Sequence, residues 1–207
     1  LVDEELVKML SDAGCKVTSF GIESGDEELR NRILNKRVSD EEIINTGYLL
    51  KKYGIRFSTF NMFNLPGETI EKAKKTLSLN IKIRSENYSW SGLLQPYKGT
   101  PVFDYANKLG LIPQGEIGAN LYHTASLKQK DTRSLEYFNS YFYWMVRYPW
   151  LIPFFLLFVK HPVRLISRLS LLFTSLHRYI SLTYPFEGIS TISNTVKLGL
   201  KRIKAYV

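Results

Sequence analysis

The chain has 207 residues, of which 44% are hydrophobic and 23% are charged, a composition typical of a folded globular protein and not of a disordered one. Its single cysteine, Cys15, excludes an intrachain disulfide and any metal site built from several cysteines. The net charge of +9 lies entirely in residues 121–207, which hold 12 Lys/Arg and 3 Asp/Glu, so we expect two regions with different partners. We expect Cys15 to be a small buried apolar residue in a protein of a reducing compartment.

The first half of the chain alternates the sequence patterns of helices and strands. Apolar residues at helical spacing predict a helix over 2–13, and Ser39 with Glu42 forms a capping box that opens another helix. The other predicted elements are a strand over 16–22, a short polar helix over 26–34, a strand over 55–63, a helix capped by Thr69, a strand over 88–94 and a helix from Pro101 to Gly110. Strands separated by helices in this way predict a parallel sheet with right-handed crossovers.

The composition changes after a loop-rich connection over 111–135. Residues 141–159 are dense in aromatic side chains and contain one charge, Arg147, and two prolines, and residues 163–182 have helical periodicity. A membrane span needs about 20 apolar residues, and two prolines argue against a plain span. Two interpretations of residues 137–182 stay open: an amphipathic segment lying in a membrane interface, or a helical subdomain packed on the rest of the protein.

Nucleic acid is not the partner we expect for this basic region. Its Lys and Arg residues are not clustered, and its aromatic residues lie in apolar runs instead of a basic groove. The three histidines, His123, His161 and His177, lack the spacing of metal ligands.

Ligands of parallel α/β sheets bind at the carboxyl ends of the strands, so the three loops that follow the predicted strands are the candidate site. Glu23 comes directly after a buried apolar run. Its carboxylate can accept two hydroxyl groups, as a ribose presents, or it can pair with a neighbouring Lys or Arg, and both interpretations stay open.

The second and third loops also carry polar and conformationally special residues. Asn61 and Asn64 lie at a buried strand end and need hydrogen-bond partners, while Gly67 lets the backbone approach a ligand closely. An acid at Glu68 suits the start of the next helix, where it can serve as a structural cap. The turn over 95–101 can pack against a flat ring.

Four segments together resemble the radical S-adenosylmethionine (SAM) superfamily, in particular the branch whose members often carry an N-terminal cobalamin-binding domain. They are FGIESG at 20–25, KRVSDEEI at 36–43, NMFNLPGET at 61–69 and QPYKGTP at 95–101. The resemblance covers residues 1–110 and implies an α/β fold, the C-terminal half of a partial parallel (β/α)6 TIM-like barrel. A linker over 111–135 and a mainly helical, aromatic and basic extension over 136–207 would follow.

The resemblance also implies which residues bind SAM. Glu23 and Ser24 would bind the ribose hydroxyls, and Arg37 would pair with the carboxylate of SAM. The segment from Asn61 to Glu68 would line the adenine, with Asn64 standing where family members usually have glycine. The residues implied in this adenine site are Asn61, Asn64, Pro66, Gly67 and Glu68, together with backbone contacts from Leu94 to Pro96. No catalytic residue or metal ligand is assigned in this chain.

The family binds a [4Fe–4S] cluster through a CxxxCxxC motif, which this chain lacks. We therefore expect a preceding part of the protein to bind the cluster, and this chain alone to be inactive. The complete enzyme would cleave SAM to a 5′-deoxyadenosyl radical and then methylate or otherwise functionalise a C–H bond, with cobalamin as a further cofactor. A hydrophobic or lipid-like substrate and a cytoplasmic location at the inner face of the membrane complete this hypothesis. The alternative is a binding or scaffold protein without catalysis, built on a partial α/β barrel.

Overall fold

The computed structural model describes residues 2–85, 88–113 and 125–183. The chain forms two compact units, Leu1–Pro162 and Val163–Val207, which are considered separately.

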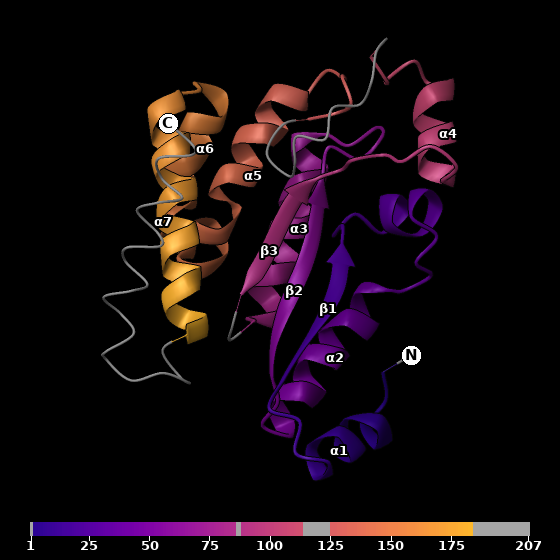
Figure 1. Ribbon diagram of the computed structural model, residues 1–207, viewed down its shortest axis with the longest axis vertical. Helices are drawn as coiled ribbons and strands as arrows, with labels where there is room; N and C mark the ends of the chain where they lie inside the picture. Colours follow the sequence, from indigo (N-terminus) through magenta and orange to yellow (C-terminus); the bar gives the residue numbers. More distant parts are fainter. Residues whose placement is uncertain (1, 86–87, 114–124, 184–207) are drawn as a thin grey trace. The chain divides into compact units, whose positions relative to one another are not determined.

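The first unit is built around a three-stranded sheet with the strand order β1-β2-β3 (Figure 1). The strands are β1 (Val17–Glu23), β2 (Arg56–Phe63) and β3 (Ser89–Leu93), and both neighbouring pairs are parallel. Each strand lies within one residue of its predicted bounds, and the prediction of a parallel α/β sheet is confirmed. Helices therefore carry the chain back from the end of one strand to the start of the next.

Three helices with side-chain N-caps accompany these strands: α1 (Glu4–Asp12), α2 (Asp40–Lys52) and α3 (Ile70–Ile83). Asp3 and Thr69 cap α1 and α3, and Ser39 and Glu42 form the predicted capping box at the start of α2. The apolar side chains of α2 and α3 pack with those of β1 and β2 in one core, which contains Ile43, Leu50, Phe57, Leu79 and Ile83. Cys15 packs against this core but is only half-buried, less than the sequence predicts.

Two short helices lie at the end of the sheet to which the strands point (Figure 1). The polar helix predicted over 26–34 is a single π-helical segment, η1 (Leu29–Ile33), and α4 (Pro101–Lys108) ends just before Gly110. Leu29 and Ile33 of η1 and Ala106 of α4 belong to a second apolar cluster with Leu65 and Leu127. Helix α1 lies at the opposite end of the sheet (Figure 1).

Helix α5 (Thr132–Arg147) belongs to the sheet core. Phe138 and Phe142 contact the Phe63 ring edge-to-face, with ring centroids 5.4 and 5.0 Å apart, and Tyr143 stacks on Tyr88 at 4.4 Å. The sequence analysis begins a separate extension at residue 136, whereas the first compact unit continues to residue 162. The physical reason is that the aromatic side chains of α5 fill the core beside the sheet.

The remaining helices are short or belong to the second unit. A 3₁₀ turn, η2 (Pro149–Leu151), leads into α6 (Ile152–Lys160), which is held to α5 by a stack of Phe155 on Tyr141 at 5.0 Å. In the second unit, α7 (Arg164–Thr183) agrees with the helix predicted over 163–182. Within the described ranges, no helix combines the length and the apolar character that crossing a membrane requires.

The packing of α5 predicts how the protein responds to truncation of an α5 side chain. Phe138 is fully buried, so Phe138→Ala should lower the free energy of unfolding by about 3–5 kcal/mol through lost burial and a new cavity. Tyr48→Ala, at an exposed position of α2, should change it by less than about 0.5 kcal/mol. Urea unfolding measures both, and a Phe138→Ala protein as stable as the Tyr48→Ala control would contradict the assignment of α5 to the core.

Candidate functional site

The loops after the three strands meet at one edge of the sheet, as predicted. Glu23 at the end of β1 pairs in register with Asn61, and Phe63 pairs with Leu93. The amide of Leu94 then donates to the carbonyl oxygen of Phe63 at 2.8 Å, which extends the contact between the second and third loops. The candidate residues of all three loops therefore line the carboxyl edge of the sheet.

Glu23 has a left-handed backbone, with φ at +64°, and the register between β1 and β2 shifts just before it. Its carboxylate folds back over Gly21, because a Cβ atom added to Gly21 would collide with Glu23 Oε1. Lys36 Nζ lies 3.0 Å from the same oxygen. One of the two interpretations of Glu23, an ion pair with a neighbouring Lys, is thus present. The Glu23 side chain in this ion pair is only 16% exposed.

The carboxylate of Glu23 lies on the face of the sheet away from α3. Gly21 pairs with Phe60, whose side chain is 44% exposed, whereas the flanking Thr59 and Asn61 side chains bond to Asn80 of α3. Because neighbouring residues in register share a face, the carboxylate over Gly21 lies on the Phe60 face. A ligand that reaches Glu23 would therefore approach from that face.

Gly25 lets the loop after β1 touch the backbone of α3. A Cβ atom at Gly25 would come within 2.5 Å of the Lys75 carbonyl and of Thr76 Cα. The Gly25 amide donates to Thr76 Oγ1 at 2.8 Å. The two glycines of the sequence GIESG thus have different purposes: Gly21 makes room for a carboxylate and Gly25 for a helix.

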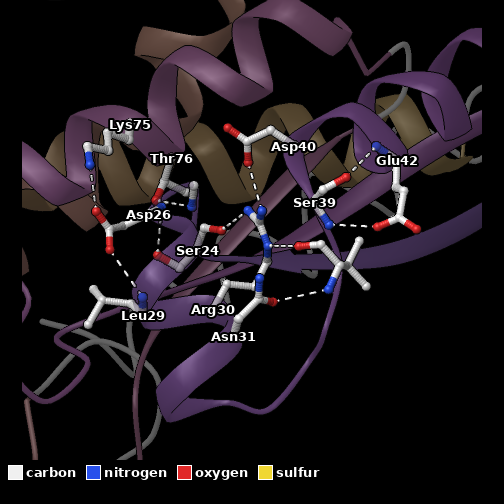
Figure 2. Close-up of polar contacts among 12 residues, drawn as sticks. Ser24, Asp26, Leu29, Arg30, Asn31, Ser39, Asp40, Glu42, Lys75 and Thr76 are labelled. Atoms are coloured by element: carbon white, nitrogen blue, oxygen red, sulfur yellow. Dashed lines mark hydrogen bonds and ion pairs between the residues drawn. The ribbon is translucent and has the colours of Figure 1, made fainter.

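A buried arginine organises this loop (Figure 2). The Arg30 side chain is 1% exposed and donates to the Ser24 carbonyl, the Val38 carbonyl and Asp40 Oδ1, each at 2.8 Å. Desolvating a guanidinium costs several kcal/mol, which these three bonds offset. Arg30 consequently ties the end of β1 to the segment that enters α2.

Asp26 anchors the same loop to α3 (Figure 2). Its carboxylate accepts from Lys75 Nζ at 2.7 Å and from the Leu29 amide at 3.1 Å, and Lys72 Nζ lies 3.6 Å away. Burial alone would raise the pKa of Asp26, but the bonds from Lys75 and Leu29 and the charge of Lys72 outweigh it and lower the pKa. Asp26 is thus a charged anchor for the loop.

The two other predicted residues of the first loop differ in exposure. Ser24 is fully buried, and its Oγ accepts from the Asp26 amide at 3.2 Å, so its hydroxyl shapes the turn (Figure 2). Arg37 is exposed, has φ at +54°, and uses Nε to donate to Asn35 Oδ1 at 3.1 Å. Asn35 itself has φ at +51°. Asparagine tolerates this conformation, so Arg37 is the strained residue of the stretch beside Lys36, and such strain often marks functional sites.

Asn61 directs its side chain into the interface between the sheet and α3. Its Oδ1 accepts from Asn80 Nδ2 at 2.7 Å and its Nδ2 donates to the Trp90 carbonyl at 2.9 Å. Asn80 in turn accepts from the Thr59 hydroxyl at 2.7 Å. The Asn61 side chain is thus bonded within the interface between the sheet and α3.

Asn64 is bound by residues 127–132, which we call the strap. Its φ of +61° suits glycine or asparagine, so an asparagine fits at a position where the resemblance implies glycine. Its Nδ2 donates to the Leu127 carbonyl at 3.0 Å, and its Oδ1 accepts from Gln129 Nε2 at 2.9 Å and Thr132 Oγ1 at 3.2 Å.

The carboxamide of Gln129 clamps the loop after β2. Besides Asn64, its Nε2 donates to the Leu65 carbonyl at 2.9 Å, and its Oε1 accepts from the Gly67 amide at 2.9 Å. Asp131 Oδ2 accepts from the Ile70 amide at 3.2 Å, one residue inside α3. The strap thus holds the predicted adenine segment from Asn64 to the start of α3.

Glu68 is a buried carboxyl group within this loop. It is 2% exposed, its Oε2 accepts from the Leu65 amide at 3.0 Å, and its Oε1 has no hydrogen-bond partner among the described residues. Burial raises the pKa of Glu68 to about 8, against bonds from the amides of Leu65 and Asn64 and with a contribution from the charge of Asp26. The neighbouring Pro66 is buried and Gly67, with φ at +78°, is exposed.

The third loop is held to the segment just before the strap. Pro96 is buried, and the Ser126 hydroxyl donates to the side-chain oxygen of Gln95. Across residues 2–85, 88–113 and 125–183, no group of three or more His, Cys, Asp or Glu residues is arranged to hold a metal ion.

Sequence reasoning missed three residues that shape the site: Arg30, Lys36 and Gln129. Arg30 lies in a segment whose charges suggest a solvated helix, and Lys36 could be predicted only as an unspecified partner of Glu23. Gln129 lies in a connection that carries no motif. The one available signal was Asn64 itself, a buried asparagine that needed partners from outside its own loop.

Comparison with known proteins relates part of the chain to one family. Residues 1–79 match the family model of the radical SAM superfamily. The chain is also similar to the uncharacterized methyltransferase PH0819 of Pyrococcus horikoshii, with 26% identity over 104 residues, which are 50% of this chain and 22% of that protein. The family match includes the loops after β1 and β2, with Glu23 and the segment from Asn61 to Glu68. Together, the two findings support the interpretation of this chain as a radical SAM superfamily member.

Proposed function

We propose that this chain is part of an enzyme that binds SAM at the carboxyl edge of β1, β2 and β3. The observation that carries the proposal is the conformation of Glu23: a left-handed backbone, a carboxylate folded over Gly21 and an ion pair to Lys36. A non-glycine residue in this conformation costs about 1–2 kcal/mol, and such strain concentrates where a side chain has to be aimed. The carboxylate can accept ribose hydroxyls in charge-assisted hydrogen bonds.

The other loops offer groups that fit the rest of the molecule. Arg37, exposed beside Lys36, would pair with the amino-acid carboxylate, and Ser24 would contribute through its position next to Glu23. The backbone of the loop after β2 and of Leu94 to Pro96 would line the adenine. Among the described residues, Oε1 of Glu68 has no hydrogen-bond partner. A carboxyl group with a pKa of about 8 is mostly protonated at neutral pH, so Glu68 would donate a hydrogen bond to an acceptor atom of the ligand.

When bound with a [4Fe–4S] cluster, SAM supplies a 5′-deoxyadenosyl radical for attack on a C–H bond. This chain has one cysteine, so the cluster ligands would come from other residues of the enzyme. The residues of this chain would orient the ribose and the adenine and exclude water from them. The name of the Pyrococcus horikoshii relative favours methyl transfer. A hydrophobic substrate and cobalamin as a further cofactor are proposed from the resemblance of the sequence motifs alone. The enzyme would work in the cytoplasm.

A binding or scaffold protein without catalysis is the second candidate. The observation that favours it is the absence of the cluster motif from this chain. It predicts that the full-length protein does not bind SAM, which the following experiment measures.

Glu23→Gln in the full-length protein should weaken SAM binding by about tenfold or more, because about 1.5–3 kcal/mol of charge-assisted hydrogen bonding is lost. Isothermal titration calorimetry measures the affinity, with Glu27→Gln at an exposed neighbouring position as the matched control. Unchanged affinity in a folded Glu23→Gln protein would reject the role of Glu23. No SAM binding by the unsubstituted protein would favour the scaffold candidate.

Gln129→Ala should loosen the adenine segment without unfolding the protein. Each lost hydrogen bond contributes about 0.5–1.5 kcal/mol, so the Gly67 amide should exchange its hydrogen about two- to tenfold faster. SAM affinity should fall by a similar factor while the melting temperature changes little. Lys130→Ala, an exposed position in the same strap, is the control for hydrogen exchange and for affinity. If Gly67 exchanges at an unchanged rate in Gln129→Ala, the strap does not position this loop.

The raised pKa of Glu68 predicts a pH dependence of stability. The folded protein keeps the proton up to pH about 8, whereas the unfolded chain releases it near 4.5, so this contribution is full below pH 4.5 and is lost as the pH rises to 8. The free energy of unfolding should fall over this window by up to about 1.4 kcal/mol per pH unit. Glu68→Gln should remove this slope, and Glu71→Gln, at an exposed position, should retain it. Urea unfolding between pH 5 and 8 tests this, and equal slopes in both variants would be the contrary result.

A further inference from the structure

One exposed apolar stripe lies on η2 and α6, which belong to the first compact unit. Trp150, Phe154 and Leu157 are 75%, 51% and 54% exposed. Phe154 and Leu157 lie three residues apart on one face of α6, and Trp150 comes four residues earlier in η2, so the three side chains recur at helical spacing. Pro153 is exposed beside them. We call these four residues the α6 stripe.

The α6 stripe is unlike the other aromatic residues of this region. Tyr141 and Phe142 are fully buried in α5, and Phe155 on the other side of α6 is stacked on Tyr141. Helix α6 thus has one face bound to α5 and another that carries large apolar side chains into solvent. Contiguous exposed apolar surface of this kind marks an interaction site.

The charged residues that flank the α6 stripe in the sequence indicate the charge of its partner. Arg147 precedes the stripe and Lys160 follows it, and both are exposed. From residue 137 to residue 162, the end of the first compact unit, the sequence has two Lys or Arg residues and no Asp or Glu. An apolar stripe flanked by a positive charge at each end is complementary to an anionic lipid surface.

We propose that the α6 stripe docks on an anionic membrane surface. Trp150 would lie at the level of the lipid headgroups, Phe154 and Leu157 would enter the boundary of the acyl chains, and Arg147 and Lys160 would contact lipid phosphates. Pro149 begins the turn η2 between α5 and α6, and Pro153 lies in the first turn of α6, so α6 can lie along a surface as a short separate helix. The α6 stripe and its flanking charges, residues 147–160, lie within the membrane segment expected at 137–182, whereas α5 is part of the protein core.

The test is flotation of the full-length protein with vesicles. Binding is expected to vesicles that contain phosphatidylglycerol, and much weaker binding to phosphatidylcholine alone. Raising the salt concentration should release the protein, because the screening length falls from about 10 Å at 0.1 M to about 3 Å at 1 M. The absence of binding to anionic vesicles overturns the proposal.

Two sets of variants separate the contribution of the apolar side chains to membrane binding from that of the positive charges. Replacing Trp150, Phe154 and Leu157 together by serine should lower binding at least about tenfold, whereas serine at the exposed Met9 and Tyr48 should leave it unchanged. Arg147→Glu with Lys160→Glu should also lower it at least about tenfold, and the same change at the exposed Lys82 and Lys108 should lower it much less.

Other occupants of the α6 stripe give distinct results. If the triple serine variant still binds anionic vesicles as well as the unsubstituted protein, the contact lies elsewhere and the proposal is wrong. If the unsubstituted protein forms a dimer that the triple variant loses, and neither binds vesicles, a second copy of the chain covers the stripe and the proposal is also wrong. These outcomes do not depend on SAM, so they leave the proposed function untouched.

Discussion

The candidate site depends on one buried charge, the guanidinium of Arg30. Its three hydrogen bonds join the Ser24 carbonyl after β1, the Val38 carbonyl before α2 and the Asp40 carboxylate in the first turn of α2. Between these partners lies Arg37, whose left-handed backbone angles are unfavourable. Such angles persist only where the surroundings over-determine them. Arg30 from one side and the contact of Gly25 with α3 from the other supply that constraint.

The parts of the fold that follow local rules were predicted from the sequence. The capping box at Ser39, the cap at Thr69 and the apolar runs of the strands gave the elements of residues 2–110 to within a few residues, because each depends on neighbours within one helical turn or on strand periodicity. The exception is η1, where the sequence shows ordinary helical spacing. Arg30 donates from this segment to three groups outside it, and this non-local requirement has no local pattern.

The site was harder to predict than the fold, since it depends on faces and on distant partners. Motif order correctly placed three loops at one edge, but it could not reveal that Asn61 faces α3 while the Glu23 carboxylate lies over Gly21 on the other face. A shift in strand register before Glu23 separates the two. Aromatic density in α5 was ambiguous for a related reason: a core helix and an interfacial helix have the same residue types, and only the partner surface distinguishes them.

The strap also sets an order of events during synthesis of the chain. The hydrogen bonds from Gln129 reach partners 64 and 65 residues earlier, so the loop after β2 leaves the ribosome long before its clamp. Contacts between residues so far apart in sequence form late, because the chain between them must first be ordered. The helices and strands of residues 2–85 can therefore assemble while Asn64, Leu65 and Gly67 still lack these partners. The hydrogen bonds that hold this loop can form only after the strap has been synthesised, just before α5.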